Sequence, residues 1–390
     1  MSVKEPGGRH GKLPSSTLKL SPRSRPAAPR PAYTAKVPEI RRGSAEPRPG
    51  AVTATQIARL AGVSVPTVSR VLNGRAGVAL STRERVEAVI REQGYRRPDT
   101  DTPAAIVELV FHALESLWAL EIIRGVERVA RAHELAVVLT EMEGRLTPGR
   151  AWTEQVLARR PAGVIAVFSE LTVAQQSQLA ARGIPLVVLD PTGEPLHQTP
   201  SVGATNWSGG LSATRHLIEL GHRRIAMVNG PVAWPCCRAR LGGYRAALEM
   251  AGLPVDPDLI RDSTLYVEGG LREGAALLAG PNPPTAVFTA NDLQAHGVYA
   301  AARRAGVRIP EELSVVGFDD LPFSRWAGPP LTTVRQPLAE MGAAAAELVV
   351  ALARGGQPRH TRLELATELV VRESTAPPRA TAVEDGAVGR

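Results

Sequence analysis

Apolar residues recur along this chain with two different spacings, and the change in spacing divides the sequence into parts. Between Val52 and Tyr95 they recur at intervals of three and four, the spacing of one face of a short helix. After Ala105, short apolar runs alternate with amphipathic helical stretches. This alternation predicts a parallel sheet with helices on both faces. We therefore expect an all-α front followed by a larger α/β body.

The helical front, residues 51–95, begins with two short helices. Thr53 can cap the first, with Gln56 at the spacing of a capping box, and Gly62 ends it. Ser64 can cap the second, and Pro66 fits its first turn, where a missing N–H breaks no hydrogen bond. Two helices joined by a short turn with glycine are typical of a helix-turn-helix, whose second helix lies in the major groove of DNA.

A third helix is expected after Asn73, where the second one ends. Its start is predicted at Ser81, because Ser81 to Glu84 has the spacing of another capping box and includes Thr82. The alternative for these helices is a small bundle with a purely structural role. Residues 51–98 hold eight Arg and three Glu, which favours contact with a polyanion.

The body repeats its strand and helix pattern twice, which indicates two α/β lobes. The first lobe is expected to have strands at Ile106–Phe111, Ala136–Leu139, Gly163–Phe168 and Leu186–Leu189, and helices near Ala119–His133, Trp152–Arg159 and Val173–Arg182. The second is expected to have strands at Ile225–Val228, Leu259–Tyr266, Ala286–Thr289 and Leu313–Phe318, and helices near Gly209–Leu220, Arg238–Ala251, Gly269–Ala279 and Leu293–Ala305. The tail adds a strand at Leu331–Arg335, a helix at Leu338–Ala353 and a strand at Arg362–Arg372.

The front also carries a longer motif. It consists of Ile57-Ala58, Ala61-Gly62-Val63-Ser64 and Thr67-Val68-Ser69-Arg70-Val71-Leu72-Asn73. This motif resembles the headpiece of LacI-type transcriptional regulators, and the resemblance continues from Val52 to about Ser374. It implies a two-lobed, periplasmic-binding-protein-like body in which the chain crosses between lobes three times. It also implies a DNA-binding regulator, expected to be a repressor, whose operator binding is controlled by a small molecule.

The resemblance assigns DNA contacts to particular headpiece positions. Val65, Pro66 and Arg70 match positions at base edges, and Arg70 can form a bidentate pair with guanine. Ser64 begins this recognition helix. The positions that match phosphate contacts are Thr53, Thr67, Ser69, Asn73 and Thr82. For each hydroxyl the alternative role is a helix cap, and both roles are compatible at Thr53 and Thr82.

The effector site is expected where ligands bind in open α/β sheets, at the carboxyl ends of the strands. The residues that fit this expectation and match the family's effector positions are Trp118, Phe168, Arg240, Asn291, Asp319 and Gln336. An aromatic ring surrounded by an Arg, an Asp and an amide suits a polyhydroxyl ligand, because each hydroxyl both donates and accepts. We therefore expect a sugar.

Other residues near the expected cleft have alternative roles. Core packing is the alternative for Trp118, and a helix or turn cap for Asp320. Tyr266 follows Leu265, the position where the family often has an aromatic. Cys236 and Cys237 either line the cleft or, as we favour, only fill space.

The charge is unevenly distributed. Residues 1–50 hold eleven basic and three acidic residues, whereas the part after residue 98 is mildly acidic, within a total of +8. The basic segment is poor in apolar residues, so it is expected to be disordered. It serves either as an arm that adds nonspecific DNA affinity or as an inert tail, and residues 375–390 form a second tail.

The linker, residues 96–104, departs from the family pattern. It is shorter than usual, contains Pro98 and Pro103, and has no leucine to insert into the minor groove. Arg96 and Arg97 could contact DNA instead. We expect an extended strap between the headpiece and the two-lobed domain, residues 105–374, without an ordered hinge helix.

The remaining features narrow the class of protein. Only two cysteines are present, adjacent in sequence, so neither a disulfide nor a metal site is expected, and a reducing cytoplasm is the simple setting. No run is long and apolar enough for a membrane, and no secretory signal is evident. No cofactor motif or catalytic motif stands out. A two-lobed enzyme or solute-binding protein with an accessory DNA-binding module stays the alternative.

One headpiece recognises only half of a symmetric operator, so a homodimer is expected. The helices Trp118–Arg131 and Gly269–Ala279 are the candidate interface elements.

Overall fold

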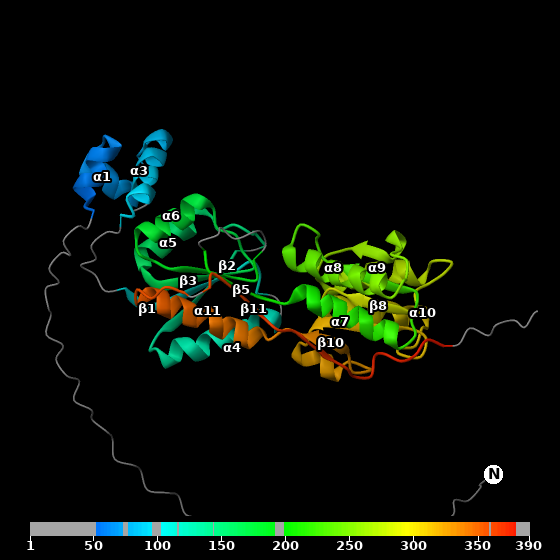
Figure 1. The fold of residues 1–390 in the computed structure, drawn as a ribbon. Helices are drawn as coiled ribbons and strands as arrows, with labels where there is room; N and C mark the ends of the chain where they lie inside the picture. The colour runs from blue at the N-terminus through cyan, green and yellow to red at the C-terminus, as the bar shows by residue number, and fades with distance from the viewer. Residues whose placement is uncertain are drawn as a thin grey trace, which may run out of the picture. The chain divides into compact units, whose positions relative to one another are not determined.

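The computed structural model describes residues 52–72, 77–95, 103–114, 117–142, 144–191, 199–358 and 360–379. The predicted N-terminal tail, residues 380–390, Asn73 and most of the linker lie outside these residues. Residues 375–379 were expected to belong to a disordered tail, but this part of the chain contacts the second lobe, where the Ala376 N–H donates to the Ser314 hydroxyl. The described chain consists of a group of N-terminal helices and two α/β lobes, each built on one sheet (Figure 1).

The N-terminal helices are α1 (Ala54–Ala61), α2 (Val65–Leu72) and α3 (Leu80–Glu92). The capping box at Thr53 is confirmed, since its side chain accepts from the Gln56 N–H and the Gln56 side chain accepts from the Thr53 N–H. The predicted capping box at Ser81 is wrong. Helix α3 begins at Leu80 after Ala79, which supplies no side-chain cap, so Thr82 lies within the first turn.

The first sheet has the strand order β11-β5-β4-β3-β1-β2, with all neighbouring pairs parallel. Its strands are β1 (Ala104–Phe111), β2 (Ala136–Glu141), β3 (Pro161–Val167), β4 (Leu186–Leu189), β5 (Ser201–Ala204) and β11 (Arg362–Leu365). Helices cover both faces of this sheet: α4 (Leu117–Ala132) and α11 (Leu338–Ala353) cover one, and α5 (Arg150–Arg159) and α6 (Val173–Ala181) the other (Figure 1).

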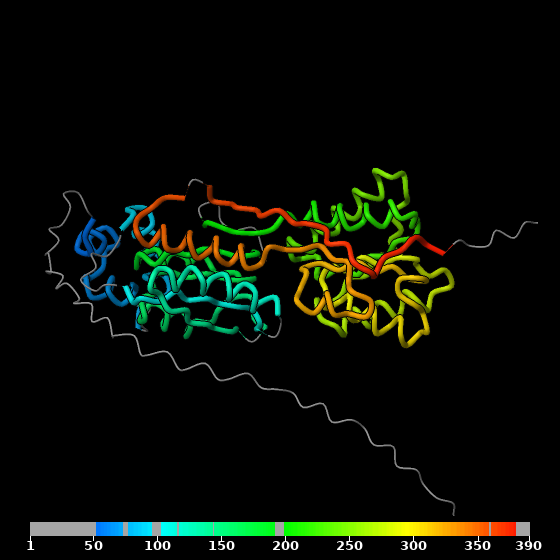
Figure 2. The backbone as a smooth tube through the Cα atoms, turned by 90° about the horizontal axis from the view of Figure 1, so that it is seen from below, coloured from blue at the N-terminus to red at the C-terminus, as the bar shows by residue number. Residues whose placement is uncertain are grey.

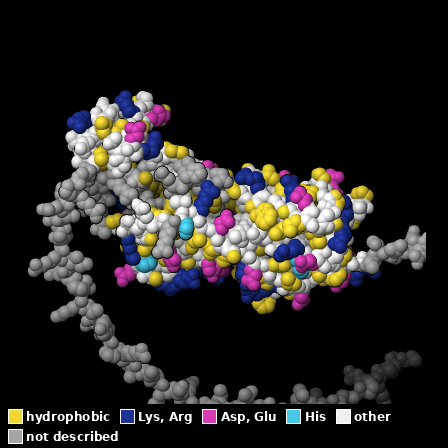
Figure 3. Space-filling view, viewed as in Figure 1, with side chains coloured by type: hydrophobic (Ala, Val, Ile, Leu, Met, Phe, Trp, Pro, Cys, Tyr) yellow, Lys and Arg dark blue, Asp and Glu magenta, His cyan; other side chains and the backbone are white. Residues whose placement is uncertain are grey.

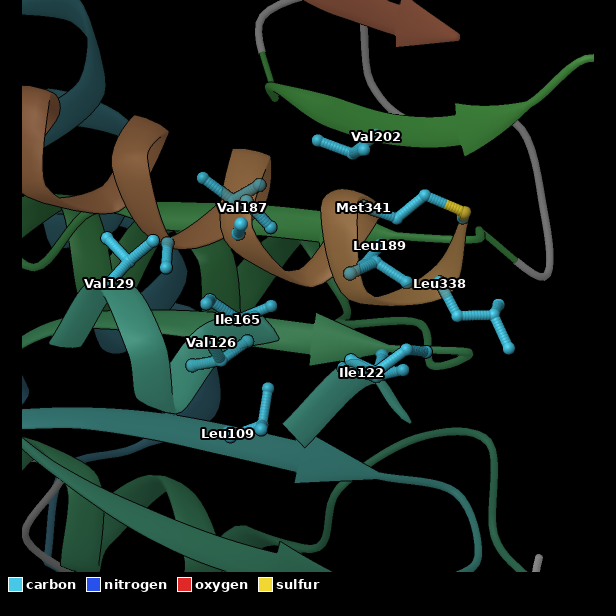
Figure 4. Close-up of a cluster of buried hydrophobic side chains, with 14 of the residues drawn as sticks. Leu109, Ile122, Val126, Val129, Ile165, Val187, Leu189, Val202, Leu338 and Met341 are labelled. Carbon is cyan, nitrogen blue, oxygen red and sulfur yellow. The ribbon is translucent and has the colours of Figure 1, made fainter. Parts of the chain in front are cut away.

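Helices α4 and α11 bury the largest group of apolar side chains in this lobe (Figure 4). Ile122 and Val126 of α4 point toward Leu109 and Ile165 of the sheet. The two helices are in direct backbone contact, because a Cβ at Gly125 would lie 1.9 Å from the Ala339 carbonyl oxygen. Only glycine fits at such a crossing.

The second sheet has the order β12-β10-β9-β8-β6-β7, parallel except for the β10–β12 pair. Its strands are β6 (Ile225–Asn229), β7 (Ile260–Asp262), β8 (Ala286–Thr289), β9 (Ser314–Asp319), β10 (Thr332–Arg335) and β12 (Glu368–Val370). Helices α7 (Asn206–Glu219) and α8 (Pro235–Met250) cover one face, and α9 (Val267–Leu278) and α10 (Asp292–Ala305) the other. Two short 3-10 helices are η1 (Pro257–Leu259) and η2 (Pro322–Trp326).

The chain passes between the two sheets at three places, as the family resemblance implied. These passages follow β5, β10 and β11, and they can be traced in Figure 2 as green, orange and red segments. Two of them are hydrogen-bonded, because the Thr367 N–H donates to the Thr205 hydroxyl over 2.9 Å.

Two predicted strands differ from the observed ones, and one observed strand was not predicted. The segment Arg362–Arg372 is not one strand, because it leaves the first sheet after Leu365 and enters the second at Glu368. Strand β7 is much shorter than the predicted Leu259–Tyr266, since η1 precedes it and a loop follows. Strand β5 had no prediction, because Ser-Val-Gly-Ala lacks an apolar run.

Candidate functional sites

Helix α2 presents its predicted base-contacting residues on one exposed face. Val68, Val71 and Leu72 are buried against α1 and α3, whereas Val65, Pro66 and Arg70 are exposed. Thr67, Ser69 and Thr82 are half-buried. Ser64 acts as the predicted cap, because its hydroxyl accepts from the Thr67 N–H over 3.3 Å. Figure 3 shows several basic side chains, in dark blue, on the N-terminal helices, with acidic side chains among them.

Three residues that line a cavity between the two sheets have an unusual backbone. Phe168 follows β3, Asp190 follows β4 and Asp319 ends β9, and their φ angles are 48°, 47° and 112°. Residues other than glycine adopt such angles at a cost of about 1–3 kcal/mol, and they concentrate at functional sites. All three are at carboxyl ends of strands, where a ligand site was expected.

Arg240, on α8, forms the centre of the polar part of this cavity. It is 3% exposed, and its Nε donates to Asn206 Oδ1 over 2.9 Å. One Nη atom donates to the Ala290 carbonyl oxygen and lies 3.9 Å from Asp319 Oδ1, while the guanidinium stacks 3.8 Å above the Phe318 ring. These contacts fix the plane of the guanidinium, which can therefore offer directed donors.

Two carboxyl groups share this guanidinium. Burial raises the pKa of Asp319 well above its usual range and also raises the pKa of Asp190, while Arg240 acts against both shifts. Asp319 accepts a 2.7 Å hydrogen bond from the Gln336 amide. Gln336 was expected to contact effector, but it does not line the cavity and holds Asp319 from behind.

Asn291 lines the cavity and is held from both sides. Its Oδ1 accepts from the Gln294 N–H over 2.9 Å at the start of α10, and its Nδ2 donates to the Leu265 carbonyl oxygen over 2.9 Å. Asp320, by contrast, is neither a cap nor a cavity residue. It forms ion pairs with Arg335 and Arg372.

Aromatic side chains form the other wall of the cavity. Phe168 packs edge to face on Trp234, with ring centroids 4.6 Å apart, and on Trp118 at 6.1 Å. His112 completes the group at 6.1 Å from Phe168. Trp118 also packs against the first lobe's core, so the two roles considered for it coincide. The empty space of the cavity, including the part that is open to solvent, is about 820 Å³.

The sequence reasoning missed several residues of this cavity. Asp190 and His112 directly follow β4 and β1, so the strand-end rule that selected Phe168 also applies to them. Trp234 immediately precedes α8, and no sequence signal distinguishes it. Leu265 and Tyr266 both line the cavity, as does Cys236.

The described residues contain neither a membrane-spanning helix nor a metal-binding cluster. They contain no helix with the length and apolar character needed to cross a membrane. They also contain no group of three or more His, Cys, Asp or Glu side chains placed to hold a metal ion.

Comparisons with known proteins match both the N-terminal helices and the second lobe. Residues 53–98 match the model of bacterial regulatory proteins of the lacI family, and residues 214–375 match a periplasmic binding protein-like domain. The transcriptional repressor CytR of Escherichia coli (strain K12) is 32% identical over 331 residues, which cover 83% of this chain and 96% of that protein. The regulator MalR of Streptomyces coelicolor is 35% identical over 82% of this chain and 95% of its own.

Solved structures show the same arrangement of parts. A complex of the transcriptional regulator CelR with cellobiose has a TM-score of 0.63 and 33% identity, over 83% of this chain and 99% of that one. The lac repressor dimer bound to operator and the anti-inducer ONPF has a TM-score of 0.61 and 27% identity, over 84% and 99%.

A helix-turn-helix followed by two α/β lobes around a ligand cavity defines a DNA-binding transcriptional regulator with an effector domain, not an enzyme. The chain belongs to the LacI family of bacterial regulators.

Proposed function

We propose that this protein is a cytoplasmic repressor that binds a palindromic operator as a homodimer and is controlled by a sugar held between its lobes. The observation that carries the proposal is the cavity itself, which has a fixed arginine and two carboxyl groups facing a wall of aromatic rings. The exposed face of α2 supports the operator-binding part of the proposal.

The polar side of the cavity suits hydroxyl groups. Arg240 can only donate, whereas Asp190 and Asp319 accept when ionised and also donate when protonated. A sugar hydroxyl does both, so adjacent hydroxyls can bridge the guanidinium and a carboxyl group. Because burial raises the pKa of both carboxyl groups, a neutral polyol fits this mixture better than an anion does.

The aromatic side suits the apolar face of a ring. Trp118, Phe168 and Trp234 all line the cavity, and Phe168 packs edge to face on both tryptophans. We infer that the effector has a second ring, as in a disaccharide. The resemblance to a regulator crystallised with cellobiose supports this inference.

The effector proposal is tested by binding a panel of glucose, cellobiose, maltose and cytidine, measured by thermal shift and calorimetry. One or more of the disaccharides should bind more tightly than glucose. Asp190→Asn should weaken that binding roughly ten- to hundredfold, because a hydrogen bond to a charged group contributes about 1.5–3 kcal/mol. Asp258→Asn, at an exposed site in η1, is the matched control and should bind normally.

Two results would oppose the effector proposal. One is cytidine binding with no response to any sugar, which would indicate a nucleoside effector. The other is equal loss of affinity in Asp190→Asn and Asp258→Asn, which would place the sugar elsewhere.

For DNA binding, we propose that Val65, Pro66 and Arg70 contact bases and that the neighbouring Ser64, Thr67 and Ser69 lie near phosphates. Thr53, Asn73 and Thr82 are the further proposed phosphate contacts. The exposure of Val65, Pro66 and Arg70 on one side of α2 supports this arrangement.

The homodimer is tested by sedimentation and gel shift at low salt. Two chains should bind each full palindrome. A monomer that binds an isolated half-site with full affinity would refute the dimer. We propose α4 and α9 as interface elements, and Leu117 and Leu120 of α4 are 39% and 41% exposed. Leu120→Arg should therefore favour the monomer, since it places a charge on an apolar contact surface.

A further inference from the structure

The chain's two cysteines lie together beside the effector cavity, in the first turn of α8. Their sulfur atoms are 3.9 Å apart, and both are free and buried. Cys236 lines the effector cavity and also a second cavity, which includes Asp190, Thr205 and Trp207. Cys236 is therefore the cysteine that a small molecule in either cavity meets, whereas Cys237 is fully buried and lines neither of them.

The two thiols differ in acidity. The pKa of Cys237 is lowered, first by a hydrogen bond from the Cys236 thiol and then by the nearby Arg240 guanidinium and the Gly230 N–H. The same hydrogen bond, together with burial, raises the pKa of Cys236 well above its usual range. The Cys237 thiol is therefore the more acidic of the two.

A disulfide does not suit this pair. The peptide bond between the two cysteines is trans, which sets their Cα atoms about 3.8 Å apart. Ordinary disulfides need Cα atoms about 4.4–6.8 Å apart and sulfur atoms about 2.05 Å apart. Closing the bond would therefore distort the first turn of α8. A larger atom that bonds to both sulfurs can bridge the 3.9 Å gap with little movement.

We propose that Cys236 and Cys237 form a dithiol site for a soft, thiophilic centre that bonds two sulfurs, with trivalent organoarsenicals as the ligand class. In the reaction, the hydrated arsenical R–As(OH)₂ meets two thiols. Two As–O bonds break, two As–S bonds form, and each thiol proton leaves with a hydroxide as water. Arsenic stays trivalent, so no oxidant or reductant is required. Soft thiolate sulfur suits such a centre.

The adduct has a direct consequence for the regulator. Cys236 shares the cavity with Asp190 and Arg240, so a group bonded to its sulfur occupies space that the sugar needs. This consequence rests on the proposed effector site, whereas the dithiol chemistry does not.

The test uses the full chain, reduced with a phosphine, and phenylarsine oxide as the probe. Because the chain holds only two cysteines, every adduct reports on this site. Intact mass should show one arsenical per chain with both thiols consumed. Excess mercaptoethanol should leave the adduct in place, and 2,3-dimercaptopropanol should remove it. Any thermal shift caused by cellobiose should disappear in the adduct.

Cys236→Ser and Cys237→Ser are the matched controls, each checked for folding by circular dichroism. Each variant retains one thiol, so its adduct lacks the second, intramolecular bond. Mercaptoethanol should therefore remove it at a concentration at least roughly 10²-fold lower than the native adduct requires. Two arsenicals per chain, no adduct, or equal lability of native and single-thiol adducts would overturn the dithiol site. An unaltered cellobiose shift in a fully formed adduct would refute only the overlap with the sugar.

Discussion

Asp292 is a fully buried carboxyl group next to Asn291, which lines the cavity. It lies at the start of α10 and accepts hydrogen bonds from the Leu321 N–H over 2.8 Å and from the Ser324 and Thr333 hydroxyls over 2.6 Å each. These bonds tie α10 and β10 to the turn that follows Asp319. Replacing Asp292 with Asn keeps the shape of the side chain and removes its charge.

Two opposing effects set the protonation of Asp292. Burial raises its pKa and is the larger effect, while the three hydrogen bonds lower it, and the result is a pKa of about 7 against 3.8 for an ordinary aspartate. Between these values the folded protein holds a proton that the unfolded chain does not. The contribution to stability is therefore complete below about pH 4 and is lost as the pH rises through about 7.

The expected loss is on the order of 4 kcal/mol, since one pKa unit corresponds to about 1.4 kcal/mol. It is measured by urea unfolding of the native chain and Asp292→Asn from pH 4 to 8.5, using the difference between their unfolding free energies at each pH. The native chain should lose stability relative to the variant as the pH rises, because asparagine does not titrate. A difference that stays constant, or that moves in favour of the native chain at pH 8, would show that the three hydrogen bonds outweigh burial.

Three further changes test the headpiece, the tail and the first lobe. Arg70→Ala should cost about 1–3 kcal/mol of operator binding and relax the preference at one base position per half-site. Arg85→Ala should instead weaken binding to all sequences alike. Gel shifts with matched and mismatched duplexes distinguish these two outcomes. Deleting residues 1–50 should weaken binding to every sequence and flatten its salt dependence; an unchanged salt slope would make the tail inert. Gly125→Ala should destabilise the protein by about 1–3 kcal/mol or more, because its Cβ would meet the Ala339 carbonyl oxygen at 1.9 Å, whereas Gly149→Ala, with open space around it, should unfold like the native chain in urea.

Periodicity predicted most of the fold because most of the elements bury a continuous apolar face. Strands β6 and β8 and helices α10 and α11 lie close to their predicted bounds. The wrong strand predictions share a cause: the strands with which a segment pairs, and not its composition, decide whether it forms a strand. Strand β5 consists of small residues without an apolar run, yet it forms because β4 and β11 supply hydrogen bonds on both sides. The last predicted strand is divided because its two halves pair in different sheets.

The rule that ligands bind at strand ends predicted part of the cavity, although Asp190 and His112, to which it also applies, were not selected. Prediction failed where tertiary contacts decide. Asp319, Phe168 and Asn291 line the cavity as expected from their positions at strand ends. Gln336 also lies next to a strand, but its side chain turns toward Asp319, which the sequence does not reveal. Trp234 joins the aromatic wall only because the second lobe meets the first there.

The positions with positive φ connect the fold to the proposed control by effector. Phe168 and Asp190 belong to the first lobe and Asp319 to the second, so strained backbone faces the cavity from both sides. Each strained residue needs surrounding contacts that hold it in place: Asp319 has Arg240 and Gln336, whereas Phe168 has Trp234 across the cavity. The contact between Phe168 and Trp234 joins the lobes and also lines the ligand site. A ligand that packs against these two rings would therefore contact both lobes at once, which is what the proposed effector control requires of a ligand that favours one lobe arrangement.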